Sequence, residues 1–548
     1  MKQTSAHRDK GGRYAAPMKR HEAKTACGSP GNCPFSLCTK LTVNCFLARR
    51  AARVSGVLYP YYPLGGQRVQ EEYLNIVGMT LLKLYCIRQA AVLAIIAGGI
   101  AGALAGGKDG TPRRDSAAEI KKSGGPVCSV RREVYVPSPQ PGVAPVIGVH
   151  HLGNGLRRRE IHARQSKSDL GENVKARFSD DNGRNWTPLA PLETGPDALR
   201  QGTNSMEEIS FAINYDPAAR RTVEMVFQRI FLGDAAEALR GFWKGEQRFY
   251  DHIMYRLSSD EGRSWTKERQ LVYEAGAVFS PQNWMNPSYL NSNRMYGSYE
   301  VTILRNGVIA YPATVTVPYE DEADRKVFAS IPKYTGAPGY VGAVRCFIGK
   351  WNQRKDDYEW TCSQPVFVPR RISTRGMGEP VIAELKDGRL LLDMRGSNAG
   401  LDPVEYPGRR WISVSSDGGR SWAPVTDLRY DTGEQFYAPS SMARFIRSSK
   451  TGKLYWIGNI SRGPAKGNLP RYPLFIAEVD EKIPALKKNT LTIIDDRGPD
   501  DTEAVQFSNF TLLENRRTLD LEIYLSRLGE KAGSAFSANA YKYTLKIR

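Results

Sequence analysis

The sequence predicts an all-β fold, because three of its features point the same way. From about Val127 to the C-terminus, short runs rich in β-branched and aromatic residues alternate with clusters of Gly, Asn, Asp and Pro, a pattern typical of strands and turns. No helical period is sustained over a comparable length. The 51 Gly and 33 Pro of the 548 residues are scattered along the chain, as many short strands separated by turns require.

The clearest strand-like runs follow one another at short intervals along the chain. In order, they cover residues 132–139, 172–179, 252–259, 301–315, 340–349, 389–395, 411–416, 453–459, 473–479, 489–495, 518–525 and 540–547.

An internal repeat gives the architecture. Three octapeptides share one template of Ser, Asp, Gly and Trp, at Ser179–Trp186, Ser258–Trp265 and Ser415–Trp422, and their starts are 79 (258 − 179) and 157 (415 − 258) residues apart. Within each, Asp and Ser are expected to hydrogen-bond the turn, Gly to permit a positive φ, and Trp to pack on the sheet. A degenerate copy ends at Trp360, and another begins at Phe475.

A period of this size with several strands per unit predicts a β-propeller, with one blade for each of the five copies. A sixth blade is assembled from residues 509–515, 518–525 and 541–547 and closed by the early strand at 132–139, so that the two ends of the body meet. We therefore expect a six-bladed β-propeller over residues 127–548.

The N-terminal region predicts export. Residues 79–106 contain Lys83 and Arg88, an apolar run from Ala90 to Ile100 and a small-x-small cleavage signal at 103–105, as in a secretory signal peptide starting at Met79. A retained signal anchor is the alternative. Residues 1–78 are expected to be a disordered extension or to precede the true start, and residues 107–126 to be a linker. The expected location is periplasmic, extracellular or membrane-anchored.

Charge and cysteine content add few constraints. The net charge is +20, of which residues 1–78 carry +8 (12 Lys and Arg minus 4 Asp and Glu), and no nucleic-acid-binding motif is present. The remaining charge fits a solvated surface or attraction to an acidic glycan. Cys346 and Cys362 flank a hairpin-like segment, where they either form a disulfide or remain free thiols. No cofactor or metal cluster is indicated, and a structural Ca²⁺ in a loop stays open.

The three octapeptides match the Asp-box repeat, and from about residue 130 to the end the chain resembles the sialidase (neuraminidase) superfamily. That family holds the substrate carboxylate with three arginines, uses an Asp as acid/base and attacks with a Tyr assisted by a Glu. Guanidinium groups suit a carboxylate, and a neutral phenol does not repel an anionic sugar. The resemblance implies these roles for Asp169 as acid/base, Glu379 as assisting acid, and Arg395 and Arg471 as carboxylate ligands.

The chain departs from the family pattern at two positions. The first arginine lies in an Arg-Ile-Pro motif in the family, which is absent between Val127 and Asp169; the nearby substitutes are Arg157, Arg158, Arg159 and Arg164, of which we take Arg164 as the candidate. The strand that resembles the nucleophile strand has Phe507 in place of the Tyr. Tyr437 is the alternative nucleophile, unless another blade supplies one.

Three functions are compatible with these residues. The first is an exported sialidase-like exo-glycosidase that hydrolyses terminal acidic sugars, with Asp169, Glu379 and Tyr437 as catalytic residues and Arg164, Arg395 and Arg471 as substrate ligands. The second is an acidic-glycan-binding propeller without turnover, which Phe507 favours. The third is an acidic-polysaccharide lyase on the same scaffold, with which His150, His151 and His162 are compatible. The expected partner in each case is an acidic glycan.

Overall fold

The computed structural model describes residues 121–548 except 193–198, 244–245 and 330–338. The chain divides after Leu104, and all of the described residues belong to the second unit. The predicted extension at 1–78 and the predicted signal segment at 79–106 therefore lie outside the described residues.

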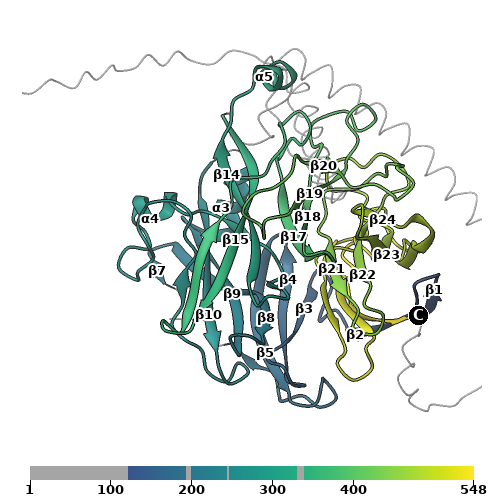
Figure 1. The fold of residues 1–548 in the computed structure, drawn as a ribbon, viewed down its shortest axis with the longest axis horizontal. Coiled ribbons are helices and arrows are strands. Elements are labelled where there is room, and N and C mark those ends of the chain that lie inside the picture. Colours follow the sequence, from purple (N-terminus) through teal and green to yellow (C-terminus); the bar gives the residue numbers. More distant parts are fainter. Residues whose placement is uncertain (1–120, 193–198, 244–245, 330–338) are drawn as a thin grey trace, which may run out of the picture. The chain divides into compact units, whose positions relative to one another are not determined.

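Six antiparallel sheets form the fold, which confirms the predicted six-bladed β-propeller (Figure 1). Blade 1 contains β3 (Ala144–His151), β4 (Arg158–Lys167), β5 (Leu170–Ser179) and β6 (Ala190–Pro191). Blade 2 contains β7 (Arg200–Gln201), β8 (Asn204–Asp216), β9 (Arg221–Phe231), β10 (Phe249–Ser258) and β11 (Arg269–Gln270). Blade 3 contains β12 (Tyr296–Gly297), β13 (Thr302–Ile303), β14 (Ile309–Pro318), β15 (Tyr340–Asn352) and β16 (Asp357–Cys362).

The second half of the propeller repeats this pattern. Blade 4 contains β17 (Gly378–Glu384), β18 (Leu390–Arg395), β19 (Arg410–Ser415) and β20 (Thr426–Asp427). Blade 5 contains β21 (Arg444–Arg447), β22 (Leu454–Asn459), β23 (Leu474–Asp480), β24 (Ala485–Leu486) and β25 (Thr492–Asp495). Blade 6 contains β26 (Thr511–Glu514), β27 (Leu521–Ser526), β28 (Ala540–Ile547), β2 (Cys128–Val136) and β1 (Lys121–Gly124).

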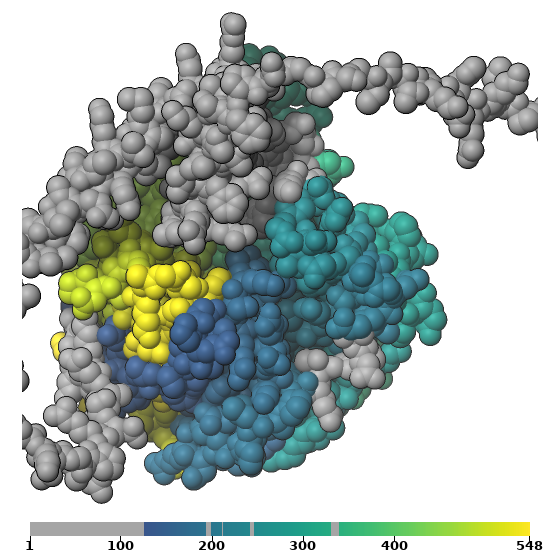
Figure 2. Space-filling model, turned by 180° about the vertical axis from the view of Figure 1, so that it is seen from behind, coloured from purple at the N-terminus to yellow at the C-terminus, as the bar shows by residue number. Residues whose placement is uncertain are grey.

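The ring closes in blade 6, as predicted. Strand β2 pairs with β28 from Cys128 opposite Ile547 to Val136 opposite Ala540. Figure 2 shows the blue residues from the start of the described part against the yellow C-terminal residues. Strand β1, formed by residues that we assigned to the linker, extends the same sheet at its edge.

The described helices are short and lie between strands. They are α3 (Ala235–Trp243), α4 (Pro287–Asn291), α5 (Glu322–Phe328) and the 3-10 turn η2 (Lys488–Thr490). In the part of the chain that the structure describes, none of them has the length and apolar character needed to cross a membrane.

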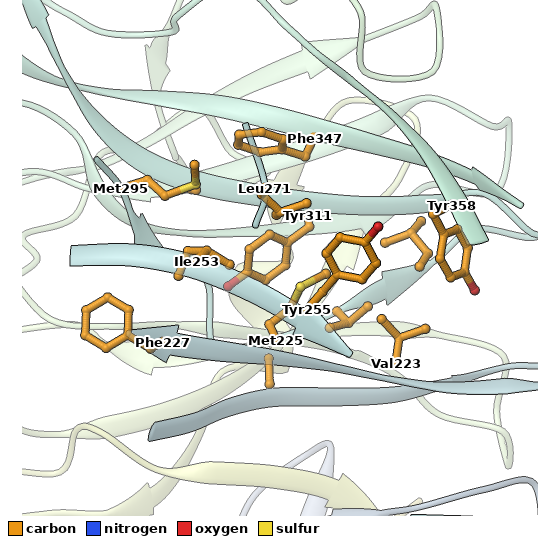
Figure 3. Packing of buried hydrophobic residues seen from close by; sticks show 14 of the residues in the cluster. Val223, Met225, Phe227, Ile253, Tyr255, Leu271, Met295, Tyr311, Phe347 and Tyr358 are labelled. Carbon is orange, nitrogen blue, oxygen red and sulfur yellow. The ribbon is translucent and has the colours of Figure 1, made fainter. Parts of the chain in front are cut away.

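Apolar side chains fill the spaces between blades. Between blades 2 and 3, Met225 and Phe227 of β9 and Ile253 of β10 face Tyr311 of β14 and Phe347 of β15, all buried (Figure 3). Each Å² of apolar area that such a seam removes from water contributes about 25 cal/mol, so the contacts between neighbouring blades stabilise the ring.

The three repeated turns adopt one geometry, and each joins the last two strands of its blade: β5 to β6, β10 to β11 and β19 to β20. In the turn at Ser415, Asp417 Oδ1 accepts hydrogen bonds from the backbone N–H groups of Arg420 and Ser421 at 3.0 and 2.9 Å, and Ser415 Oγ accepts one from Gly419 N at 2.8 Å. Gly419 has φ +89, which explains why glycine is needed there. These turns mark one end of the propeller, which we call the turn end.

Strand register explains why Cys346 and Cys362 do not form a disulfide. Cys362 of β16 lies opposite Phe347 of β15, so the neighbouring Cys346 projects from the other face of the sheet. Both residues are free thiols.

Candidate functional site

The candidate residues of blade 4 lie at the end of the propeller opposite the turn end. Glu379 begins β17 and Arg395 ends β18, with Gly378 opposite Arg395, whereas the turn at Ser415 pairs with Leu390 at the far end of β18. We call the end that carries Glu379 and Arg395 the site end. Neighbouring strands are antiparallel in the other blades too. Each blade therefore has one end at the turn end and the other at the site end.

Glu379 and Arg395 form a direct ion pair. Arg395 Nη1 donates to Glu379 Oε1 at 2.6 Å, and the two side chains are only 17% and 13% exposed. Glu379 has φ 41, in the left-handed region, at an irregularity in the register between Gly378 and Val381. This rare backbone conformation for a glutamate turns its side chain towards the end of the neighbouring strand. Its second oxygen, Oε2, is buried without a hydrogen-bond partner in the protein.

Arg471 is held at the same end by blades 5 and 6. It precedes β23, its Nη1 donates to Gln506 Oε1 at 3.1 Å and its Nη2 to the carbonyl oxygen of Ser440 at 2.8 Å. Its Nε is buried without a partner. Burial lowers the pKa of the Arg471 guanidinium, an effect that the nearby carboxylate of Glu379 opposes and the charge of Arg395 increases. The two arginines and the acid therefore share one electrostatic environment.

Two tyrosines from blade 3 belong to this environment. Tyr296 lies on β12 and Tyr299 in the irregular segment before β13, and their hydroxyls are hydrogen-bonded to each other. Burial raises the pKa of the Tyr299 phenol, and the negative charge of Glu379 raises it further, while Arg395 and Arg444 act in the opposite direction. We call Glu379, Arg395, Arg471 and Tyr299 the acid–arginine cluster.

Arg444 lies beneath this cluster at the start of β21. Its guanidinium packs against the ring of Tyr299, 5.2 Å from the ring centre, and its side chain is 4% exposed. The nearest carboxylate is Glu300 at 3.9 Å, and Nε and Nη1 have no hydrogen-bond partner in the protein. Burial accordingly lowers the pKa of Arg444.

Asp169 approaches the cluster from blade 1. It lies in the tight turn between β4 and β5, with φ 61, and is exposed, with Ser168 Oγ donating to its Oδ2 at 2.9 Å. Its negative charge acts against the effect of burial on the pKa of Arg471, and it also raises the pKa of Arg229 of β9. The hairpin thus places a solvent-accessible carboxyl group near the buried arginines.

Comparison with known proteins gives matches of structure only. No family model and no curated protein matches the sequence. A Dyadobacter fermentans protein of unknown function matches with a TM-score of 0.48 at 14% identity, covering 76% of this chain and 99% of that one. The NanB sialidase of Streptococcus pneumoniae matches with a TM-score of 0.47 at 12% identity, covering 75% of this chain and 70% of that one. The intramolecular trans-sialidase of Ruminococcus gnavus matches with a TM-score of 0.41 at 12% identity, covering 74% of this chain and 95% of that one.

In fold, the chain resembles sialidases. At these identities the likeness concerns the fold alone.

The position where the resemblance to sialidases suggested a tyrosine is part of the core. Phe507 is fully buried among apolar residues of blades 5 and 6, with Arg527 over its ring at 5.0 Å. Its backbone N–H donates to the carbonyl of Arg471 at 3.0 Å, and its neighbour Gln506 is the residue that contacts the Arg471 side chain. An amide therefore stands next to Arg471 in this segment.

Tyr437 and Arg164 have other surroundings. The ring of Tyr437 lies over Arg409, 5.1 Å from its guanidinium carbon, and its backbone pairs with Ser461. Arg164 is an exposed residue of β4, opposite Pro145 and Glu172. Among the described residues, Glu379 is hydrogen-bonded to Arg395, and Arg471 to Gln506 and Ser440, and not to Tyr437 or Arg164.

The other arginines considered for the first substrate ligand are committed to ion pairs. Arg158 binds Glu522 at 2.8 Å and Arg159 binds Glu224 at 2.6 Å, both pairs being buried, while Arg157 binds Asp180. All three lie at the start of β4 or just before it, towards the turn end.

Two of the candidate histidines are held in the neutral form, because burial lowers the pKa of His150 and of His151 to about 3. The ring of His162 is hydrogen-bonded to Glu160. Within the described ranges, no group of three His, Cys, Asp or Glu side chains gathers as it would around a metal ion.

Sequence reasoning missed Tyr296, Tyr299, Arg444 and Gln506. The segment that carries the two tyrosines has no strand period, and nothing in its local sequence indicates which blade it faces. A signal existed only in the accumulation of Tyr and Glu just before the strand at 301–315.

Proposed function

We propose that this protein is a glycosidase that removes terminal acidic sugars from glycans, with the acid–arginine cluster as its active site. The observation that carries the proposal is the convergence of Glu379, Arg395, Arg471 and Tyr299 from three blades at one end of the propeller. Propeller enzymes commonly place such sites where several blades meet, because loops from all blades face one axis.

The unpaired polar atoms of the cluster support a polar ligand. Buried polar atoms are nearly always hydrogen-bonded, and yet Arg471 Nε, Arg444 Nε and Glu379 Oε2 are not. With Arg444 Nη1, these atoms make three donors and one acceptor in the same region, which match a carboxylate accompanied by a hydroxyl group. A sugar carboxylate fits the arginines, since guanidinium groups bind carboxylates in a bidentate manner.

Cleavage of the glycosidic bond requires an acid, a nucleophile and a base, and three side chains fit these roles. Asp169 gives its proton to the leaving oxygen, while the Tyr299 hydroxyl attacks the anomeric carbon and passes its proton to Glu379. Water then attacks the same carbon, Asp169 takes a proton from that water, and Tyr299 leaves and recovers its proton from Glu379. Because each step inverts the carbon, the overall stereochemistry is retained.

Tyr299 is the tyrosine that we assign to this role in place of Tyr437. The carboxylate of Glu379 acts on Tyr299, and Arg395 and Arg444 stabilise the charge that develops on the phenolate as it leaves. Tyr437, in contrast, packs on Arg409.

A fluorogenic sialoside assay on the full chain tests the proposal. We expect hydrolysis by the wild type, and losses of at least about 100-fold in kcat for Glu379→Gln, Asp169→Asn and Tyr299→Phe, since each removes a group that transfers protons or attacks carbon. Tyr437→Phe serves as the matched control and is expected to retain activity. Hydrolysis that survives in both Glu379→Gln and Tyr299→Phe would reject the site.

A binding protein without turnover is the second candidate, and Phe507 favours it. The strand that the resemblance marks as carrying the nucleophile presents a buried ring with no oxygen. If the wild type binds a sialoside by calorimetry, Arg471→Gln abolishes this binding, and no hydrolysis is detected, the binding function is the correct one. A rise in ultraviolet absorbance on a uronate polymer would instead indicate a lyase.

Export forms part of the proposed function. The segment at 79–106 supports secretion or anchoring, and an acidic glycan at the cell surface is the partner that we infer. N-terminal sequencing of the protein recovered outside the cytoplasm distinguishes cleavage after Ala105 from a retained anchor.

A further inference from the structure

A basic pocket lies at the site end, next to the acid–arginine cluster in the sequence. It has a volume of about 290 Å³ and is lined by Arg462, Tyr472, Arg497, Gly498 and Pro499. Arg462 follows β22, Tyr472 is separated from β23 by Pro473 alone, and Arg497 follows β25. Since Leu474 of β23 is opposite Asp495 of β25, these segments share the end of blade 5 that holds Arg471.

Arg497 is the cation of this pocket that is available to a ligand. Three neighbouring acids are bound to other arginines: Asp495 to Arg132 at 2.9 Å, Asp501 to Arg527 at 2.6 Å, and Asp496 to Arg462. Arg497 is exposed, and its Nε donates only to the carbonyl oxygen of Asp501, at 3.4 Å. Within the described ranges, no carboxylate lies at ion-pair distance from its guanidinium.

The pocket and the acid–arginine cluster are close along the chain but distinct in space. Arg471 and Tyr472 are consecutive, so their Cα atoms are about 3.8 Å apart. In extended backbone, consecutive side chains point in opposite directions. Arg471 contacts Gln506 and Ser440, whereas the half-buried Tyr472 packs against the core of blades 5 and 6 and lines the pocket.

We propose that this pocket is a second subsite, which takes a second acidic sugar next to the terminal one. This inference rests on the proposed function, because the terminal sugar is the one bound at Arg395 and Arg471. Tyr472 offers a ring face and a hydroxyl to a sugar, and Arg497 offers an unpaired cation to its carboxylate. The substrate class is therefore a glycan with consecutive negatively charged sugars, rather than an acidic sugar on a neutral chain.

Calorimetry on the full chain with two probes tests the subsite. The probes are a disaccharide of two linked sialic acids and 3′-sialyllactose, which carries one charge. We expect the wild type to bind the doubly charged probe at least about tenfold more tightly. Arg497→Gln is expected to lower that affinity about tenfold, as loss of one charged hydrogen bond does, and to leave 3′-sialyllactose binding within twofold. Arg497→Glu is expected to lower the affinity for the doubly charged probe further.

The controls separate this inference from the proposed function. Arg354→Gln, an exposed arginine in the β15–β16 turn at the turn end, is expected to change neither affinity. Equal binding of both probes by the wild type, or equal losses for both in Arg497→Gln, would overturn the subsite while leaving the acid–arginine cluster in place. If the wild type bound neither probe, the proposed function and the subsite would both fail.

Discussion

The Glu208–Glu268 pair of blade 2 makes the stability of this propeller depend on pH. Glu268 precedes β11, its side chain is 13% exposed, and its Oε1 accepts a hydrogen bond from Arg256 Nη1 at 3.4 Å. Glu208 of β8 accepts one from Gln228 Nε2 at 3.2 Å. Burial, and then the charge of Glu208, raise the pKa of Glu268 from 4.5 to about 8. Glu268, next to the carboxyl group of Glu208, therefore keeps its proton at neutral pH.

The sign of the effect follows from the direction of this pKa change. The folded protein keeps a proton on Glu268 that the unfolded chain releases above about pH 4.5, so the free energy of unfolding falls as pH rises from about 4.5 to about 8. A pKa change from 4.5 to about 8 corresponds to about 5 kcal/mol in the free energy of unfolding, at about 1.4 kcal/mol per tenfold change in proton affinity. Because the Glu268 side chain is partly exposed to solvent, which screens the charge of Glu208, we expect a smaller change of about 2 to 3 kcal/mol.

Glu268→Gln removes this titration while keeping the shape of the protonated acid. Urea unfolding at pH 5, 7 and 9 is expected to show equal stability of wild type and variant at pH 5, and a variant that is about 2 to 3 kcal/mol more stable at pH 9. Glu503→Gln, at an exposed position, is the control and is expected to follow the wild type at each pH. A difference between wild type and Glu268→Gln that is the same at pH 5 and pH 9 would refute the reasoning.

Three further substitutions test the scaffold. Asp393→Ala leaves the buried Arg410 guanidinium without the carboxylate that binds it at 2.8 Å, and is expected to cost about 3 to 5 kcal/mol in urea unfolding; a loss below about 1 kcal/mol would contradict this. Asp417→Ala removes the acceptor of two backbone hydrogen bonds and is expected to cost about 1 to 2 kcal/mol, with Asp417→Asn costing less in the same measurement. Phe507→Tyr buries an unpaired hydroxyl and is expected to lower the melting temperature without raising sialoside turnover; increased turnover would show that residue 507 reaches the site.

The sequence alone predicted the parts of the fold that depend on local chemistry. The three repeated turns could be found because their geometry needs specific residues, such as a glycine at the positive φ of Gly419. Closure of the ring by residues 128–136 and 540–547 could be predicted because the last blade lacked a strand that only the N-terminal part could supply.

The site was less predictable, because its contacts join blades through irregular segments. Tyr299 lies outside any strand, and its relation to Glu379, 80 residues later (379 − 299), follows from how blades 3 and 4 pack and not from a period. Glu208 and Glu268 are likewise brought together only by the sheet of blade 2. The disulfide alternative for Cys346 and Cys362 was open for the same reason, since a one-residue difference in register decides which face each thiol occupies.

The pairing of β2 with β28 has a consequence for synthesis on the ribosome. Strand β2 is translated before every strand from β3 to β28, yet its partner along one edge is β28, at residues 540–547. Until that segment leaves the ribosome, blade 6 has no central strand, and the backbone N–H and C=O groups on that edge of β2 lack their native partners. An open strand edge recruits other chains. The incomplete chain is therefore the form of this protein most in need of a chaperone. The β2–β28 pairing closes the ring of the finished protein, and its absence leaves one edge of β2 unpaired during synthesis.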